Sequence, residues 1–185
     1  MDADLTEHLL NWVRSHYFGK YRGVVKDNED DTNRGRLKVS VPSVLGDLEL
    51  WAMPCVPYAG DSVGFYSLPP NGSGVWVEFE AGDPSYPIWT GCFWADNELP
   101  DSGGPAVKIW KTDKLTVRLD DDKDELLLST DSDSQVTLSE DVEIESGGSK
   151  HTVGSDGVAS NSGGVGKVEI TSGSVSVNSG AFEVS

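Results

Sequence analysis

Residues 111–185 contain one aromatic residue, Phe182, and no proline, which limits how this part of the chain can build a core. Its aliphatic residues come in short strand-like clusters separated by Asp, Ser and Gly. Recurrence of such clusters indicates a degenerate repeat of short strands. The clusters are Leu115/Val117/Leu119, Leu126–Leu128, Val136/Leu138, Val142/Ile144, Val153, Val158, Val168/Ile170, Val175/Val177 and Phe182/Val184.

A repeat with so few aliphatic side chains per strand is not expected to stay folded as a single copy. Each strand offers two or three aliphatic side chains on one face, and their burial contributes ~25 cal/mol per Å². Ordering the backbone costs about 1–2 kcal/mol per residue. Three copies whose apolar sides meet on a common axis would overcome this deficit. We therefore predict an intertwined trimeric β-helix, or β-prism, over residues 107–185.

The preceding part of the chain has a different composition. All six tryptophans and all nine prolines lie at or before Trp110. Residues 20–97 read as about five short strands between glycine-rich turns, with Leu37, Val39 and Val41 on one face of one strand. This pattern predicts a small closed barrel of the oligonucleotide/oligosaccharide-binding (OB) type. The segment ELPDSGGPA, residues 98–106, is a turn-rich linker.

The N-terminal segment, residues 1–19, is predicted to be an amphipathic helix, with helical spacing over residues 4–18. Leu5, Leu9, Trp12, Val13 and Tyr17 follow an i, i+4, i+7, i+8 pattern. Because this stripe precedes an otherwise complete barrel, we interpret it as a partner contact in preference to core. The whole chain is thus predicted to be all-β, apart from this helix.

Charge and cysteine content restrict the class of function. The formal net charge is −17, which disfavours nucleic acid and anionic membrane surfaces. The acidic start, MDADLTEHLL, does not resemble a signal peptide, and we expect synthesis in the cytoplasm. Cys55 and Cys92 are expected to be buried thiols more readily than a disulfide. The histidines form no metal-binding pair, and no cofactor is expected.

Three polar clusters suggest chemistry, but each has a simpler interpretation. Glu78 and Glu80 could serve a glycosidase, but no cleft is indicated, and a solvated strand face is favoured. The basic residues Arg34, Arg36 and Lys38 could bind single-stranded nucleic acid, or could pair with the acidic loop 27–31. The run DDDKDE, residues 120–125, lacks the glycine of a calcium loop and is predicted to be a charged turn. We predict no enzymatic activity.

Residues 21–94 resemble the barrel of the phage baseplate assembly protein V family and the spikes of related contractile injection systems. The resemblance is carried by the runs YRGVVKDNEDDTNRGRLKVSVPSV, LELWAMPCVPYAG and GFYSLPPNGSGVWVEFEAGDPSYPIWTGCFW. Shared features are G-R-x-x-V-x-V-P, P-P-x-G-x-x-V-W-V-x-F-E-x-G-D-P and P-x-W-x-G. The C-terminal part is similar to the family's β-prism in character only.

The resemblance implies a homotrimeric central spike of a contractile tail baseplate. It would dock under the tail hub protein and make transient contact with the target envelope, which it pierces when the sheath contracts. The protein would belong to a virion tail or an extracellular or cytoplasmic injection particle. Leu5, Leu9, Trp12, Val13 and Tyr17 are then candidate hub contacts. The residues implied to hold the barrel's bends are Gly35, Pro42, Gly60, Gly74, Gly82, Pro84 and Gly91.

The sequence also departs from parts of this family. Only residues 98–106 separate barrel and repeat, so the lysozyme domain of some relatives has no room. The end NSGAFEVS lacks the iron-binding HxH motif of some phage spikes. Phe182 and Val184 are therefore candidate contacts for a PAAR-type tip protein, or they finish the core. The alternatives are an OB-fold nucleic-acid-binding module with an acidic tail, and a component of a cell-wall hydrolase.

Overall fold

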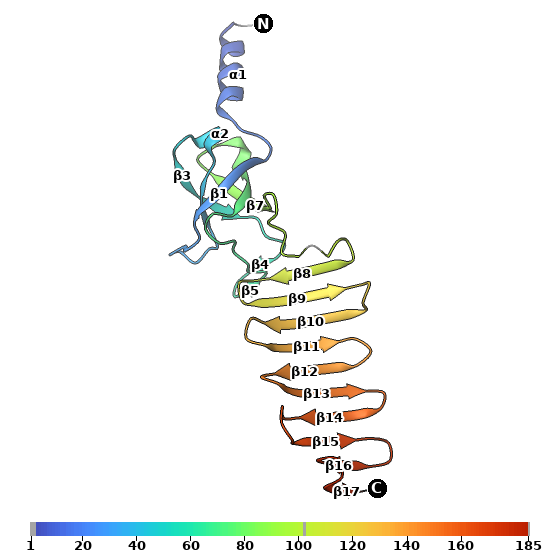
Figure 1. Ribbon diagram of the computed structural model, residues 1–185. Helices are drawn as coiled ribbons and strands as arrows, with labels where there is room; N and C mark the ends of the chain where they lie inside the picture. Colours follow the sequence, from blue (N-terminus) through green and yellow to red (C-terminus); the bar gives the residue numbers. More distant parts are fainter. Residues whose placement is uncertain (1–2, 102, 185) are drawn as a thin grey trace. The chain divides into compact units, whose positions relative to one another are not determined.

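The computed structural model of the chain describes residues 3–101 and 103–184. The chain divides into two compact units, the first ending at Glu98 and the second beginning at Leu99. The first unit holds the helix α1 and a barrel, and the second holds one large sheet (Figure 1). Residues 1, 2, 102 and 185 of the predicted segments lie outside the described residues.

The barrel confirms the OB-type architecture predicted from the sequence. Its strands are closed in the order β1-β2-β3-β7-β6. The β3–β7 pair is parallel, while the other neighbours in the barrel are antiparallel. This is the five-stranded closed barrel of an OB fold. The strands are β1 (Tyr21–Asp27), β2 (Leu37–Ser40), β3 (Glu49–Pro54), β6 (Gly74–Phe79) and β7 (Pro87–Phe93).

The barrel core is built by the predicted alternation along its strands. Along β6, residues alternate between buried and half-buried positions, which places Val75, Val77 and Phe79 inside. The β-branched and leucine side chains of β2 are fully buried in the same way. Such strands are amphipathic because successive side chains point to opposite faces. The core consists of Val25, Leu37, Val39, Val41, Ala52, Val75, Val77, Phe79 and Trp89.

Short elements connect the barrel strands, and the sequence did not predict all of them. The helix α2 (Pro42–Leu45) begins with proline, whose fixed φ suits a first helical turn. The strands β4 (Ala59–Gly60) and β5 (Val63–Gly64) form a separate two-stranded hairpin. The 3₁₀ helix η1 (Glu80–Gly82) links β6 to β7.

The helix α1 (Ala3–Ser15) is shorter than the predicted stretch 4–18. Two side chains meet the backbone carbonyl of Trp12 where the helix ends. The Ser15 hydroxyl donates to this oxygen at 3.1 Å, and Nδ1 of His16 lies 2.8 Å from it. These bonds satisfy a carbonyl that the last helical turn leaves unpaired. The chain therefore leaves the helix before Gly19, where the sequence had placed its end.

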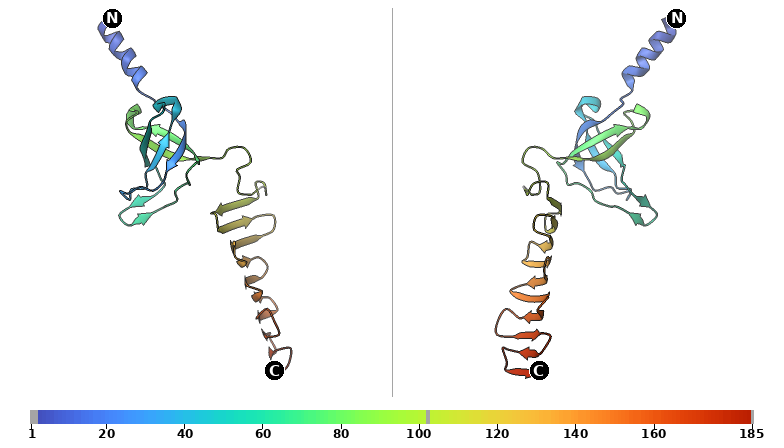
Figure 2. Two further views of the ribbon diagram at one scale, coloured as in Figure 1. Left: turned by 60° about the vertical axis from the view of Figure 1, so that its left-hand side comes forward. Right: turned by 90° about the vertical axis from the view of Figure 1, so that its right-hand side faces the viewer.

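The second unit is a ten-stranded antiparallel meander in which each strand pairs with its neighbours in the chain (Figures 1 and 2). Among the described residues of this unit, only Asp120 is buried. The strands are β8 (Val107–Lys111), β9 (Leu115–Asp120), β10 (Glu125–Thr130), β11 (Ser134–Leu138), β12 (Val142–Ser146), β13 (Ser149–Gly154), β14 (Gly157–Asn161), β15 (Lys167–Ile170), β16 (Val175–Val177) and β17 (Phe182–Val184).

Candidate interaction surfaces

One face of the ten-stranded sheet carries an apolar stripe made of two columns of residues. The cross-strand register sets these columns, because directly paired residues share a face. The first column is Leu119, Leu126, Leu138, Val142, Val153, Val158, Ile170, Val175 and Val184. The second column is Trp110, Val117, Leu128, Val136, Ile144, Val168, Val177 and Phe182, with His151 and Ser160 between Ile144 and Val168.

The apolar stripe is largely uncovered within one chain. The exposed fractions of Val142, Ile144 and Phe182 are 39%, 48% and 63%. Strands lie about 4.8 Å apart, so the stripe runs for roughly 43 Å along the sheet. A hollow of about 370 Å³ lies along it, lined by Val117, Val136 and Ile144 among others. Continuous exposed apolar surface of this extent marks an interaction site.

The opposite face of the sheet is mainly polar and internally paired, although Ile109 and Leu127 also lie on it. Lys150 bonds to Glu143 at 2.5 Å, and Lys167 bonds to Glu169 at 2.6 Å. The hydrogen bond to Glu143 raises the pKa of Lys150 above its ordinary value, which keeps the ammonium charged. The sheet therefore has one face whose apolar stripe would be stabilised by burial against a partner, and one face whose charged side chains favour contact with solvent.

The predicted charged turn at residues 120–125 is held by ion pairs. Arg118 lies 2.9 Å from both Asp101 and Asp120. Burial of Asp120 opposes ionisation, yet the hydrogen bond from Arg118 keeps the pKa of this carboxyl below its usual range. Backbone N–H groups of Asp122 and Lys123 also donate to Asp120. The Asp120 carboxylate thus stabilises the turn, in agreement with the interpretation of residues 120–125 as a charged turn.

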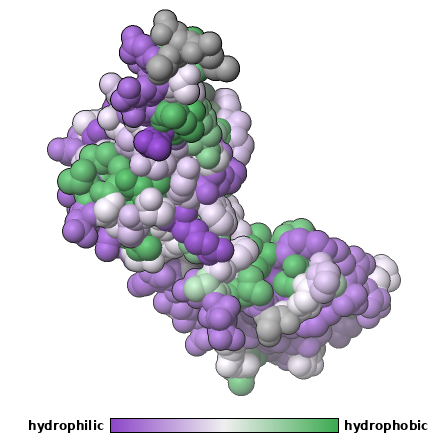
Figure 3. Space-filling model, turned by 90° about the horizontal axis from the view of Figure 1, so that it is seen from above, coloured by the Kyte–Doolittle hydropathy of each residue, from purple (hydrophilic) through white to green (hydrophobic). Residues whose placement is uncertain are grey.

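The helix α1 presents large apolar side chains at its surface. The exposed fractions of Leu5, Leu9, Trp12 and Val13 lie between 46% and 61%. Apolar and hydrophilic residues both contribute to the molecular surface in the space-filling view (Figure 3). These four predicted hub-contact residues are therefore available within one chain.

Tyr17 differs from the other predicted hub contacts, because it is engaged within the chain. Because α1 ends at Ser15, Tyr17 leaves the helical stripe and packs against the barrel core. Its ring centroid lies 6.2 Å from that of Phe79 and 6.1 Å from that of Tyr21. Its backbone N–H donates to the carbonyl of Gly82 at 2.7 Å. Tyr17 thus joins the helix to the barrel.

Gly82 and Gly74 show why the barrel needs glycine at particular bends. Gly82 has φ +83°, and a Cβ there would lie 2.8 Å from the ring of Phe18. At Gly74, a Cβ would lie 2.6 Å from the ring of Phe93, which covers this glycine. Gly35 and Gly91 also have positive φ, Gly60 lies in β4, Pro42 begins α2, and Pro84 follows η1.

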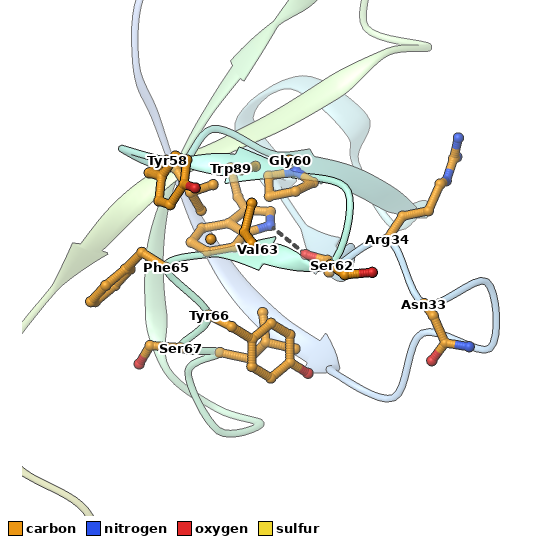
Figure 4. Close-up of a pocket in the computed structure, with 16 residues that line it drawn as sticks. Asn33, Arg34, Tyr58, Gly60, Ser62, Val63, Phe65, Tyr66, Ser67 and Trp89 are labelled. Carbon is orange, nitrogen blue, oxygen red and sulfur yellow. Dashed lines mark hydrogen bonds between the residues drawn. The ribbon is translucent and has the colours of Figure 1, made fainter.

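A cavity of about 500 Å³ opens beside Trp89 of the barrel. Figure 4 shows Tyr58, Val63 and Phe65, from the β4–β5 hairpin and its flanks, around this indole. The indole N–H donates to the carbonyl of Gly35 at 3.2 Å, which holds the ring in place. Among the described residues that line the cavity, Arg34 alone carries a charge. The residues described around the cavity could contact an apolar group, and they include no pair of side chains for acid–base catalysis.

The predicted basic cluster is mostly engaged within the chain. Arg36 bonds to Asp30 of the acidic loop at 2.7 Å, and its guanidinium lies 5.2 Å from the ring centroid of Trp51. The hydrogen bond from Arg36 holds the pKa of Asp30 well below its usual range. Lys38 lies 3.9 Å from Glu49. The predicted pairing with the acidic loop 27–31 thus holds for Arg36, within one chain, whereas Lys38 pairs with Glu49 of β3.

The candidate catalytic glutamates do not form a paired site. Glu78 accepts from Lys20 at 2.8 Å on the outside of the barrel. Glu80 lies at the start of η1, with an exposed side chain. Two carboxylates that act on a glycosidic bond must face each other across a cleft. The positions of these residues instead match a solvated face.

The cysteines differ from the sequence expectation, because both are free and exposed. The β6–β7 register shifts between Val75 and Val77, and Gly91 in β7 has φ +141°. Even so, Cys92 keeps the alternation counted from the buried Pro87 and Trp89, which places it on the outer face of β7. Partial burial still raises the pKa of the Cys92 thiol. Cys55 follows the end of β3, where alternation no longer applies.

Phe182 and Val184 lie on β17, the last strand of the meander, and both are exposed. Within residues 3–101 and 103–184, no group of three or more His, Cys, Asp or Glu side chains could hold a metal ion. Over the same described residues, no helix is long and apolar enough to cross a membrane.

Comparison with known proteins finds a match for the barrel. Residues 21–94 match the family model described as the Type VI secretion system/phage-baseplate injector OB domain. The matched residues begin at the first residue of β1 and end just after β7, so the match covers the complete barrel. A search of curated proteins finds no match.

Proposed function

We propose that the protein is the central spike of a contractile tail baseplate, from the premise that its barrel matches the model of the Type VI secretion system/phage-baseplate injector OB domain. Three copies would assemble, with the barrels as a collar and the sheets as a central shaft. The observation that carries this proposal is the apolar stripe on a single-layer sheet that follows the barrel in the chain. The particle would be a phage tail or a related injection machine.

The sheet supports self-association because its apolar stripe has no cover within the chain. A stripe roughly 43 Å long and two side chains wide has an area on the order of 500 Å². Specific protein interfaces bury about 800 Å² per partner, so the stripe and its flanks are of suitable size. Another copy of the same sheet offers a stripe of equal length and chemistry.

The narrowness of the stripe favours three copies over two. A two-layer sandwich buries the full inner face of each sheet. Here most positions in the row beside the second column are polar, as at Thr130, Ser134 and Ser146, with Leu115 as an apolar exception. Three sheets around one axis need only a central apolar band on each. The corners of the prism then leave these flanking hydroxyls near water.

The shape of the sheet supports a piercing role. Strands β9 and β10 contain six residues each, and β16 and β17 contain three each. At about 3.3 Å per residue, the width falls from roughly 20 Å to roughly 10 Å towards the C-terminal end. A shaft that narrows towards one end concentrates force where that end meets an envelope. Phe182 and Val184 at that end would seat a separate tip protein.

The exposed face of α1 would bind the tail hub. Leu5, Leu9, Trp12 and Val13 form its apolar stripe, and an amphipathic helix typically lays such a stripe in a partner's groove. Tyr17 has no part in this contact, because it is packed against the barrel.

The nucleic-acid-binding alternative has less support. Arg36 and Lys38 are paired with acidic residues of the same chain. The second unit is an ordered sheet, whereas an acidic solubilising tail would be disordered. We therefore propose a mechanical, non-catalytic role.

The proposal is tested by the mass of the purified protein. Multi-angle light scattering should give a single species of about three times 19.9 kDa. Negative-stain images should show a shaft that protrudes from a wider collar. As a matched pair, Val136→Asp on the apolar stripe should abolish the trimer, while Thr137→Asp on the polar face should retain it. A monodisperse wild-type monomer would exclude the proposed spike.

A further inference from the structure

The apolar stripe is interrupted by polar side chains at one level of the sheet. His151 on β13 and Ser160 on β14 are direct cross-strand partners. Nδ1 of His151 lies 2.7 Å from the hydroxyl oxygen of Ser160. The same column continues with Ile144 on one side and Val168 on the other. We call these two residues the polar level.

The aliphatic part of the stripe cannot define how copies align along their axis. Valine, leucine and isoleucine follow one another on successive strands. A shift of one chain by two strands, about 10 Å, again places aliphatic side chains opposite aliphatic side chains. Such interchangeable contacts specify register weakly.

We propose that the polar level sets the axial register in which copies of this chain assemble; this inference rests on the proposed trimer. In register, three imidazoles and three hydroxyls share one level. The bond to Ser160 engages Nδ1 and leaves Nε2 of His151 to meet a polar group of a neighbouring copy. Polar residues within an apolar seam fix register in this way.

A shift by two strands removes these partners. His151 would then face the level of Val136 on β11 or Val168 on β15. Ser160 would face the level of Ile144 on β12 or Val177 on β16. A buried donor or acceptor without a partner is unfavourable, so shifted assemblies are disfavoured. Three copies that share one register are also equivalent by symmetry, whereas any shifted copy breaks this equivalence.

Isoleucine methyl NMR spectra report this equivalence directly. Ile144 and Ile170 lie in the apolar stripe on either side of the polar level, and Ile88 lies in the barrel. In the wild-type trimer we expect one methyl resonance for each. In the double variant His151→Val/Ser160→Val, Ile144 and Ile170 should each split into several resonances, while Ile88 stays single.

The control variant is Val153→Ala, which alters the stripe on β13 but keeps the polar level. It should lower the thermal midpoint of the trimer and retain single resonances. Single resonances in the double variant, or split resonances in the wild type, would overturn the inference while leaving the trimer intact. A monomeric double variant would also overturn it, because an aliphatic level should associate at least as tightly. A monomeric wild type would overturn both proposals.

Discussion

Truncation of Ile144 tests whether the apolar stripe is the interface between copies. Full burial of an isoleucine side chain stabilises by about 1.5–3 kcal/mol. Ile144 is 48% exposed in one chain, so assembly would bury roughly the remaining half. Ile144→Ala should then remove about 1 kcal/mol of association free energy per chain. Three chains lose about 3 kcal/mol, which corresponds to a roughly 100-fold weaker trimer.

Sedimentation equilibrium over a range of protein concentrations measures this change in the association constant. The matched control is Thr152→Ala on β13, because Thr152 pairs with Glu143 on the polar face. This control should leave the association constant within about twofold, since surface substitutions change stability little. An unchanged constant for Ile144→Ala, or an equal loss for Thr152→Ala, would refute the assignment of the interface.

Three further predictions concern the barrel and its junction with α1. Gly82→Ala should accelerate amide hydrogen exchange at residues 16–18, because the new methyl group meets the ring of Phe18; unchanged exchange would contradict this packing. Leu37→Ala should lower the free energy of barrel unfolding in urea by about 2–5 kcal/mol, as expected for a fully buried leucine, and a loss below about 1 kcal/mol would argue against its core position. Asp30 has a lowered folded pKa, so its stabilising contribution is complete above its unfolded pKa of about 3.9 and is lost as pH falls through the folded value. Asp30→Asn should therefore destabilise the barrel at pH 7. In this variant the thermal midpoint should fall less steeply than in the wild type as pH is lowered below about 4. A decline as steep as that of the wild type would contradict the proposed ion pair.

The barrel could be predicted well from the sequence because its strands obey a simple rule. Leu37, Val39 and Val41 share the face that the sequence predicts for one strand, and all three are fully buried. Cys92 was misplaced because the expectation of a buried thiol followed the residue type, whereas alternation with the buried Trp89 puts it on the outer face of β7. The register shift between Val75 and Val77 was not predicted either. A shift of register depends on the neighbouring strand, which periodicity within one strand does not report.

The ends of elements were harder to predict than their existence. Leu5, Leu9, Trp12, Val13 and Tyr17 satisfy helical spacing, and spacing alone carries the helix through Tyr17. The helix instead ends at Ser15, where side chains bond to the carbonyl of Trp12, and the barrel provides a competing apolar surface. Tertiary contacts thus decided where local periodicity stopped.

The apolar stripe was visible in the sequence only as clusters. The meander converts Val136, Ile144 and Val168 into one column, and this needs the turn lengths that set each register. The polar level could not be recognised before pairing was known, because His151 and Ser160 are nine residues apart. The number of copies is a property of the assembly, and the sequence of one chain constrains it only indirectly.

The meander makes the second unit adjustable in length. Strands β8–β17 pair only with the strands before and after them in the chain. Removal or duplication of one hairpin therefore changes the height of the sheet by about 10 Å without rerouting any other strand. In the proposed spike, gain or loss of hairpins would match the reach of this part to envelopes of different thickness, while the barrel stays the same.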